Sequence, residues 1–266
     1  MTDRIHIFPE AKDISPALAA RIARMDEEAV RSRGRFAVAL SGGSLLDILS
    51  PSLIANPIRS QVNWGSWEIF WADERCVPLF SPDSNFAAAN RLLFKHVGIP
   101  WSQIHEIDDS LKPKEAARIY QATIKDVLRP HAGRLPRFDL ILLGMGQDGH
   151  TASLFPGHEA VQEIQKWVVP VLDAPKPPAE RITLTLPVIN QAREVIFVAT
   201  GAGKASALRR VFDSQNHGQS LPAALVNPFH GHLTWYVDKA AAGELVRLDD
   251  PRTTMFGFQR SDREES

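Results

Sequence analysis

The chain has 266 residues, with 30 Lys plus Arg against 31 Asp plus Glu and a formal net charge of -1. Hydrophobic residues make up 44% and charged residues 23%, which is typical of a globular protein and excludes a disordered chain. The balanced charge argues against a duplex nucleic-acid binder, because such proteins usually carry a basic excess. The single cysteine, Cys76, excludes an internal disulfide framework and fits a reducing compartment.

Targeting signals are not evident in the sequence. Residues 1–8 lack the basic and apolar regions of a signal peptide, and no apolar run is long enough to cross a bilayer. We therefore expect a cytoplasmic protein with no membrane partner.

Strand-like and helix-like segments alternate along the chain. Short apolar, β-branched runs predict strands at 35–40, 67–72, 138–143, 168–172, 181–186, 194–200, 233–237 and 239–243. Helical patterns lie at 14–33, 45–54, 85–96, 115–128 and 204–212. The alternation predicts an α/β fold, with a mostly parallel sheet flanked by helices. We expect one domain over residues 1–248 and a polar, frayed C-terminal tail over 249–266.

Loops that follow strands are the candidate sites, because ligands of open α/β sheets bind beyond the carboxyl ends of the strands. Ser41-Gly42-Gly43-Ser44 follows the first predicted strand and opens a helix. Its glycines permit close approach, and free N–H groups at a helix start attract anions, so the loop predicts a phosphate cradle. A tight turn with Ser44 as N-cap is the alternative. The Lys-Ser/Thr ending of a Walker loop is absent, so nucleoside triphosphate hydrolysis is not supported.

Charged residues stand in two further loops. Asp73-Glu74-Arg75 follows an apolar strand and either holds a polar ligand or forms a solvated cluster of salt bridges. Lys204 lies at a helix start, where its charge opposes the helix dipole and so indicates an anionic ligand.

A glycine-rich loop follows the most apolar predicted strand. Gly144, Gly146 and Gly149 form a G-x-G-x-x-G pattern, which raises the question of a dinucleotide site. Pro156 and Gly157 interrupt the chain almost at once, and they leave too short a helix for a site of that kind.

The same loop contains Asp148 and His150. Histidine titrates near neutrality and is the commonest general base, and a nearby carboxylate can orient its ring. A histidine that only bonds the loop backbone is the alternative. The position of His150 in a glycine-rich loop after a buried strand favours catalysis.

Other chemistries lack their motifs. Neither a G-x-S-x-G nucleophile elbow nor an H-E-x-x-H zinc motif occurs. His230 and His232 flank Gly231, but no third metal ligand is evident, so we expect no metal site.

Seven segments together resemble the 6-phosphogluconolactonase family, in the order SGGS, WADER, SNFAAANRLLF, FDLILLGMGQDGHTASLFPG, RITLTLPVIN, VATGAGKA and PAALV. The resemblance extends from about Phe36 to about Ala242, most of the chain. The resemblance implies a Rossmann-like fold shared with glucosamine-6-phosphate deaminases and ribose-5-phosphate isomerases. It also implies hydrolysis of 6-phospho-D-glucono-1,5-lactone to 6-phospho-D-gluconate in the oxidative pentose phosphate pathway, without a metal or organic cofactor.

The resemblance also implies roles for individual residues. His150 would be the general base that activates water, with Asp148 as its support. The remaining residues of the expected site bind the substrate and its phosphate, and they are Ser41, Gly42, Gly43, Ser44, Asp73, Arg75, Asn85, Gly146, Arg181 and Lys204. Arg181 begins its predicted strand instead of ending it, so the pattern alone says little for it.

Two other classes of function remain as alternatives. A sugar-phosphate isomerase or deaminase of the same fold would carry Asp-Glu-Tyr where this chain has Asp73-Glu74-Arg75. A non-catalytic sugar-phosphate sensor usually carries a DNA-binding domain, and no helix-turn-helix segment is evident. We expect a monomer or weak homo-oligomer with a small-molecule substrate and no nucleic-acid partner.

Overall fold

The computed structural model describes residues 4–212, 221–245 and 253–255. Its main sheet has seven strands, which are β1 (Arg4–Phe8), β2 (Phe36–Leu40), β3 (Trp67–Trp71), β5 (Leu140–Gly144), β8 (Glu194–Ala199), β9 (His232–Asp238) and β10 (Thr253–Met255). Their order is β10-β1-β9-β8-β5-β2-β3, and every neighbouring pair is parallel. The α/β fold predicted from the sequence is therefore confirmed.

A second, smaller sheet lies beside the main one. It contains β4 (Asp73–Arg75), β7 (Arg181–Leu184) and β6 (Val168–Val171), in that order, and both of its pairings are antiparallel. The chain passes from β3 into β4 through Ala72 alone, whose carbonyl accepts a hydrogen bond from the Leu184 N–H. This short passage brings the end of β3 and the small sheet together.

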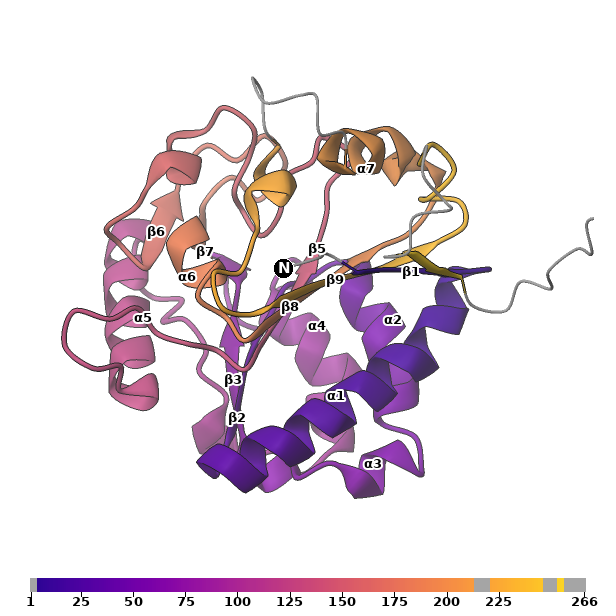
Figure 1. The fold of residues 1–266 in the computed structure, drawn as a ribbon. Coiled ribbons are helices and arrows are strands. Elements are labelled where there is room, and N and C mark those ends of the chain that lie inside the picture. Colours follow the sequence, from indigo (N-terminus) through magenta and orange to yellow (C-terminus); the bar gives the residue numbers. More distant parts are fainter. Residues whose placement is uncertain (1–3, 213–220, 246–252, 256–266) are drawn as a thin grey trace, which may run out of the picture.

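Helices cover both faces of the main sheet (Figure 1). They are α1 (Ala11–Arg33), α2 (Ser44–Leu53), α3 (Ile58–Gln61), α4 (Asn85–Leu92), α5 (Pro113–Leu128), α6 (Leu186–Ile189) and α7 (Ala205–Phe212). Figure 1 shows α1 and α2 on one face and α7 on the other. Local sequence sets their ends: α1 stops at Gly34, which has a φ of 74°. Ser84 caps α4 by accepting a hydrogen bond from the Ala87 N–H.

The predicted strand at 239–243 is wrong. Residues 239–244 form turns, because the Asp238 carboxylate accepts hydrogen bonds from the N–H groups of Gly201 and Ala241 and curls the chain after β9. β1 and the small-sheet strand β4 were not expected as strands. Within the expected C-terminal tail, Thr253–Met255 pairs with β1, and the other tail residues lie outside the described residues.

None of the described helices is both long and apolar enough to span a membrane.

A buried carboxylate ties α1 to the start of β3. Asp26 is 0% exposed, and its oxygens accept hydrogen bonds from the Asn63 N–H at 2.9 Å, the Asn63 amide at 2.8 Å and the Trp67 indole N–H at 2.9 Å. A buried polar group that loses its partners costs more than an average hydrogen bond contributes. Asp26 is therefore a structural residue of the α1–β3 contact.

Asp26→Ala is expected to lower the free energy of unfolding by about 1–3 kcal/mol, because it leaves buried donors without an acceptor. Urea denaturation measures the change. Glu27→Ala, on the exposed side of the same helix, is the matched control. Equal denaturation midpoints for the two variants would contradict the role of Asp26.

Candidate active site

His150 and Asp148 form a directly bonded pair at the end of β5. The His150 Nδ1 lies 2.5 Å from Asp148 Oδ1, and the two side chains are 17% and 38% exposed. An ionised carboxylate only accepts hydrogen bonds, so the pair places a proton on Nδ1. The ring's Nε2 has no hydrogen-bond partner among the described residues, which leaves a lone pair available to a ligand.

The glycines of this loop make the pair sterically possible. A Cβ on Gly146 would lie 2.1 Å from His150 Nδ1 and 2.3 Å from Asp148 Oδ1, so no side chain fits there. Gly149 has a φ of 81°, a conformation that favours glycine. The Gly146 N–H also donates to the His150 carbonyl at 2.8 Å. The G-x-G-x-x-G pattern thus serves the close turn that brings Asp148 to His150.

Electrostatics keep the imidazole of His150 neutral at physiological pH. Burial lowers its pKa below 6.5, and this effect outweighs the opposing influence of Asp148. For Asp148, burial raises the pKa, but the hydrogen bond and charge interaction with His150 and the backbone hydrogen bonds of the loop together lower it below 3.8. A neutral imidazole beside an ionised carboxylate is the state that a general base requires.

Asp73 joins three loops of the site. It is 5% exposed, and its two carboxylate oxygens accept hydrogen bonds from Ser41 Oγ at 3.2 Å and Ser153 Oγ at 2.8 Å. Its backbone carbonyl accepts a third bond, from the Asn85 amide at 2.7 Å. The sequence predicted that Asp73 binds the substrate, but its carboxylate oxygens are already bonded to protein groups.

Glu74 performs a similar structural task at the start of α4. It is 0% exposed and accepts hydrogen bonds from the backbone N–H groups of Asn85 and Phe86, each at 2.8 Å. Burial raises its pKa to about 7. The carboxylates of Asp73 and Glu74 are therefore buried and bonded to protein groups, and of this charged triplet only Arg75 is available to contact a ligand.

Arg75 and Arg181 are register partners across the β4–β7 pair. Arg181 is 4% exposed, and its guanidinium donates to the carbonyls of Pro178 and Lys176 and to Ser153 Oγ, so it meets no carboxylate directly. Burial and the charge of Arg75 lower the pKa of Arg181. The Nε of Arg75 is buried without a hydrogen-bond partner. Neither arginine forms a salt bridge with a carboxylate of the described residues, and two adjacent cations without one favour an anion between them.

The antiparallel pairing also explains why sequence reasoning gave little weight to Arg181. β7 runs against β4, so its first residue lies at the carboxyl end of β4. Sequence reasoning missed Ser153, which links Asp73 to Arg181, and Phe155, whose ring centroid lies 4.6 Å from that of His150 and 5.6 Å from the Arg181 Cζ. Both follow His150 in the TASLF segment, and that proximity was the available signal.

The glycine-serine loop follows β2 and packs against Asn85. A Cβ on Gly42 would lie 1.8 Å from Asn85 Oδ1, which accounts for the glycine. Gly43, with a φ of 70°, is the N-cap of α2, and Ser44 is the first residue of that helix. The alternative in which Ser44 is the N-cap is wrong. Ser44 is exposed, and the loop presents N–H groups at a helix start.

Lys204 lies in the loop after β8, within electrostatic reach of Asp148. Burial lowers its pKa, the positive charge of Lys176 lowers it further, and Asp148 opposes them. Lys176 also lowers the pKa of His150. Sequence reasoning missed Lys176, because the proline-rich loop that carries it shows no relation to the site until the fold is formed. The site thus combines a neutral base with four nearby cationic side chains.

Comparison with known proteins supplies a family. The sequence matches the family described as glucosamine-6-phosphate isomerases/6-phosphogluconolactonase over residues 9–235. It is 42% identical over 253 residues to a Homo sapiens protein named 6-phosphogluconolactonase, covering 94% of this chain and 97% of the human one. It is 43% identical over 249 residues to a probable chloroplastic 6-phosphogluconolactonase of Oryza sativa subsp. indica, covering 91% and 76% of the two chains.

Solved structures agree with the sequence comparison. The 6-phosphogluconolactonase of Trypanosoma brucei superposes with a TM-score of 0.77 at 28% identity, over 92% of this chain and 99% of that one. The Trypanosoma cruzi enzyme gives a TM-score of 0.79 at 27% identity, over 92% and 97%. Because the match in sequence and fold spans most of its length, the chain belongs to the glucosamine-6-phosphate isomerase/6-phosphogluconolactonase family.

Proposed function

We propose that this protein hydrolyses 6-phospho-D-glucono-1,5-lactone to 6-phospho-D-gluconate, as a carboxylic ester hydrolase of the pentose phosphate pathway. The observation that carries the proposal is the 2.5 Å His150–Asp148 pair beside a cluster of cations. Relatives and structural neighbours named 6-phosphogluconolactonase support the same reaction. An isomerase or deaminase reaction and a non-catalytic sensor are not favoured by these relatives.

In the first step, His150 Nε2 takes a proton from a water molecule while the water oxygen bonds to the lactone carbonyl carbon. Asp148 holds the Nδ1 proton and stabilises the imidazolium that forms, because its carboxylate lies within hydrogen-bond distance. The carbonyl becomes a tetrahedral oxyanion.

In the second step, the oxyanion reforms the carbonyl and the bond between that carbon and the ring oxygen breaks. His150 returns its proton to the departing ring oxygen, which becomes a hydroxyl group. The new carboxylic acid loses its proton to water at neutral pH. The histidine ends neutral, so every proton and electron pair is accounted for without a metal or an organic cofactor.

The phosphate of the substrate binds among the cations of the site. Arg75 and Arg181 offer guanidinium donors from adjacent strands, Lys204 adds a positive charge, and the Ser41–Ser44 loop offers N–H groups and hydroxyls. Charge-assisted hydrogen bonds of this kind are stronger than neutral ones. We assign Asp73 and Asn85 a positioning role, because their side chains already bond to the protein.

We also propose a single catalytic domain over residues 1–248, to whose sheet Thr253–Met255 adds an edge strand. We propose a monomer or weak homo-oligomer, since the proposed site is built from one chain. A cytoplasmic location fits the single cysteine of the sequence. The Oryza sativa relatives carry the word chloroplastic in their names, so relatives of this name occur in more than one compartment.

A lactonase assay coupled to 6-phosphogluconate dehydrogenase tests the proposed reaction. The signal is compared with spontaneous hydrolysis of the lactone, measured without the protein and with folded His150→Ala. Acceleration by the wild-type chain alone supports the proposal. A rate equal to the spontaneous one, or release of ammonia from glucosamine 6-phosphate instead, would overturn it.

His150→Ala is expected to reduce kcat by about 10²–10⁴-fold, the usual contribution of a positioned general base. The substitution removes a partly exposed ring, so the fold should survive; circular dichroism checks this. His158→Ala is the matched control, because His158 also bonds an aspartate, Asp173, but lies outside the proposed site. Near-normal turnover by folded His150→Ala would exclude His150 as the base.

The dependence of kcat/KM on pH should report the pKa of His150. Its pKa lies below 6.5, so the base is neutral above that value and activity falls only as the pH drops further through the pKa. Asp148→Asn removes the charge that raises this pKa, so the acid limb should move to lower pH while kcat decreases. Stopped-flow assays over the acid range measure both. An acid limb that moves to higher pH in Asp148→Asn would contradict the assignment.

Removal of the side chains that we propose to bind the phosphate should weaken ligand binding more than it affects proton transfer by His150. A hydrogen bond to a charged group contributes roughly 1.5–3 kcal/mol, so Arg75→Ala and Lys204→Ala should each bind 6-phosphogluconate about tenfold or more weakly. Titration calorimetry measures the affinity. Arg118→Ala is the control, since Arg118 pairs with Glu115 on the exposed face of α5. Parental affinity in both site variants would place the phosphate elsewhere.

A further inference from the structure

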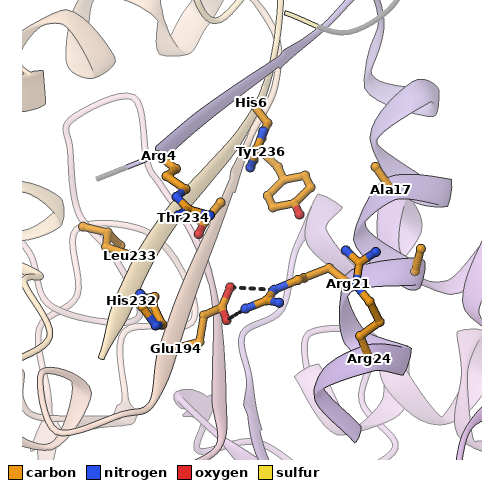
Figure 2. Close-up of a pocket in the computed structure, with 11 residues that line it drawn as sticks. Arg4, His6, Ala17, Arg21, Arg24, Glu194, His232, Leu233, Thr234 and Tyr236 are labelled. Carbon is orange, nitrogen blue, oxygen red and sulfur yellow. Dashed lines mark hydrogen bonds and ion pairs between the residues drawn. The ribbon is translucent and has the colours of Figure 1, made fainter. Parts of the chain in front are cut away.

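A second cavity lies between α1 and the main sheet. Its volume is about 530 Å³, a size that accommodates a small organic ligand. Arg4 and His6 reach it from β1, Thr234 and Tyr236 from β9, and Arg21 from α1 (Figure 2). The remaining lining residues are Ala17, Ala20, Arg24, Glu194, His232 and Leu233.

The composition of this cavity departs from that of an ordinary helix–sheet interface. The helix face offers Ala17 and Ala20, whose small side chains leave space, and then Arg21 and Arg24 one turn further on. Interfaces of this kind are normally filled by large apolar side chains. Here the sheet instead presents polar side chains, and Tyr236 directs its hydroxyl toward the arginines (Figure 2).

The charges of the cavity are unbalanced. Glu194 is buried and engages Arg21 through two hydrogen bonds, so these two charges compensate each other. Arg4 and Arg24 line the cavity from opposite sides and form no ion pair with any carboxylate of the described residues. Burial, together with the charges of Arg4 and Arg21, lowers the pKa of His6, so its ring enters the cavity uncharged.

A neighbouring depression extends the positive surface. It shares Arg21, Glu194 and His232 with the cavity and has a volume of about 240 Å³. There Arg33 and Arg193 both meet Asp139, at 2.9 and 3.2 Å. Burial and the charges of Arg33 and Arg137 lower the pKa of Arg193, which is the effect expected where positive charge exceeds negative.

We propose that this cavity is a second binding site, which takes a phosphorylated small organic molecule whose negative charge is attracted by Arg4 on the sheet side and Arg24 on the helix side. The guanidinium groups supply charge-assisted donors for the phosphate. Tyr236 and His6, with ring centroids 5.0 Å apart, form an aromatic wall for the organic part. Inorganic phosphate alone would fill only a small part of the cavity, so we expect the ligand to carry an organic part as well.

The cavity is separate from the proposed active site. Arg4, Glu194 and His232 are the first residues of β1, β8 and β9, so the cavity opens at the amino end of the parallel sheet. His150 and Lys204 follow the carboxyl ends of β5 and β8, at the opposite edge. Ligand binding at the cavity therefore adds to the lactonase proposal and does not depend on it.

Titration calorimetry with ADP as the probe tests the second site on the full chain. Wild-type protein should bind ADP, whereas adenosine should not bind and inorganic pyrophosphate should bind more weakly than ADP. Arg4→Ala and Arg24→Ala should each weaken ADP binding severalfold, since each removes a positive charge that lines the cavity. Arg31→Ala, an exposed arginine of the same helix, should bind as the wild type does.

A further variant locates the bound probe. Arg181→Ala, in the proposed active site, should leave ADP affinity unchanged, and thermal melting should confirm that all variants are folded. Loss of ADP binding in Arg181→Ala with retention in Arg4→Ala and Arg24→Ala would overturn the proposal. So would the absence of ADP binding to the wild type, or equal affinities for pyrophosphate and ADP.

Discussion

The hydrogen bond between Asp148 and His150 is the constraint around which the proposed active site is organised. At 2.5 Å it requires the loop after β5 to fold tightly back, and Gly146 must lack a side chain for the two groups to meet. The bond fixes which imidazole nitrogen carries the proton and leaves the other to face a ligand. Replacement of Gly146 would therefore disturb the pair even though glycine itself carries no reactive group.

The second organising feature is the division of charge between the interior and the site. Asp73 and Glu74 are buried, and their oxygens are satisfied by hydroxyls and backbone N–H groups, so neither neutralises the neighbouring arginines directly. Arg75 and Arg181 are left facing each other across the small sheet. Their repulsion persists in the unliganded protein, because folding fixes them in place, and an anionic ligand would relieve it. This arrangement favours substrates that carry a phosphate.

Much of the fold and the centre of the site follow from local sequence, but the small sheet does not. The apolar runs predict most of the parallel strands, and the glycine-rich loop after β5 predicts the histidine–aspartate pair. β4 consists of charged residues, and its strand partner is β7, which is distant in sequence, so no local pattern reveals it. The same long-range pairing brings Arg181 to the site. Lys176 reaches it through a loop whose composition indicates only turns.

General-base catalysis by His150 requires a neutral ring with its proton on Nδ1, and the protonation state of this ring can be measured. Nitrogen-15 NMR of histidine-labelled protein, assigned with the His150→Ala variant, distinguishes the two ring nitrogens. We expect a neutral ring at pH 7 with the proton on Nδ1 and an unprotonated Nε2. A ring protonated on Nε2 at that pH, either as the cation or as the other neutral tautomer, would contradict it.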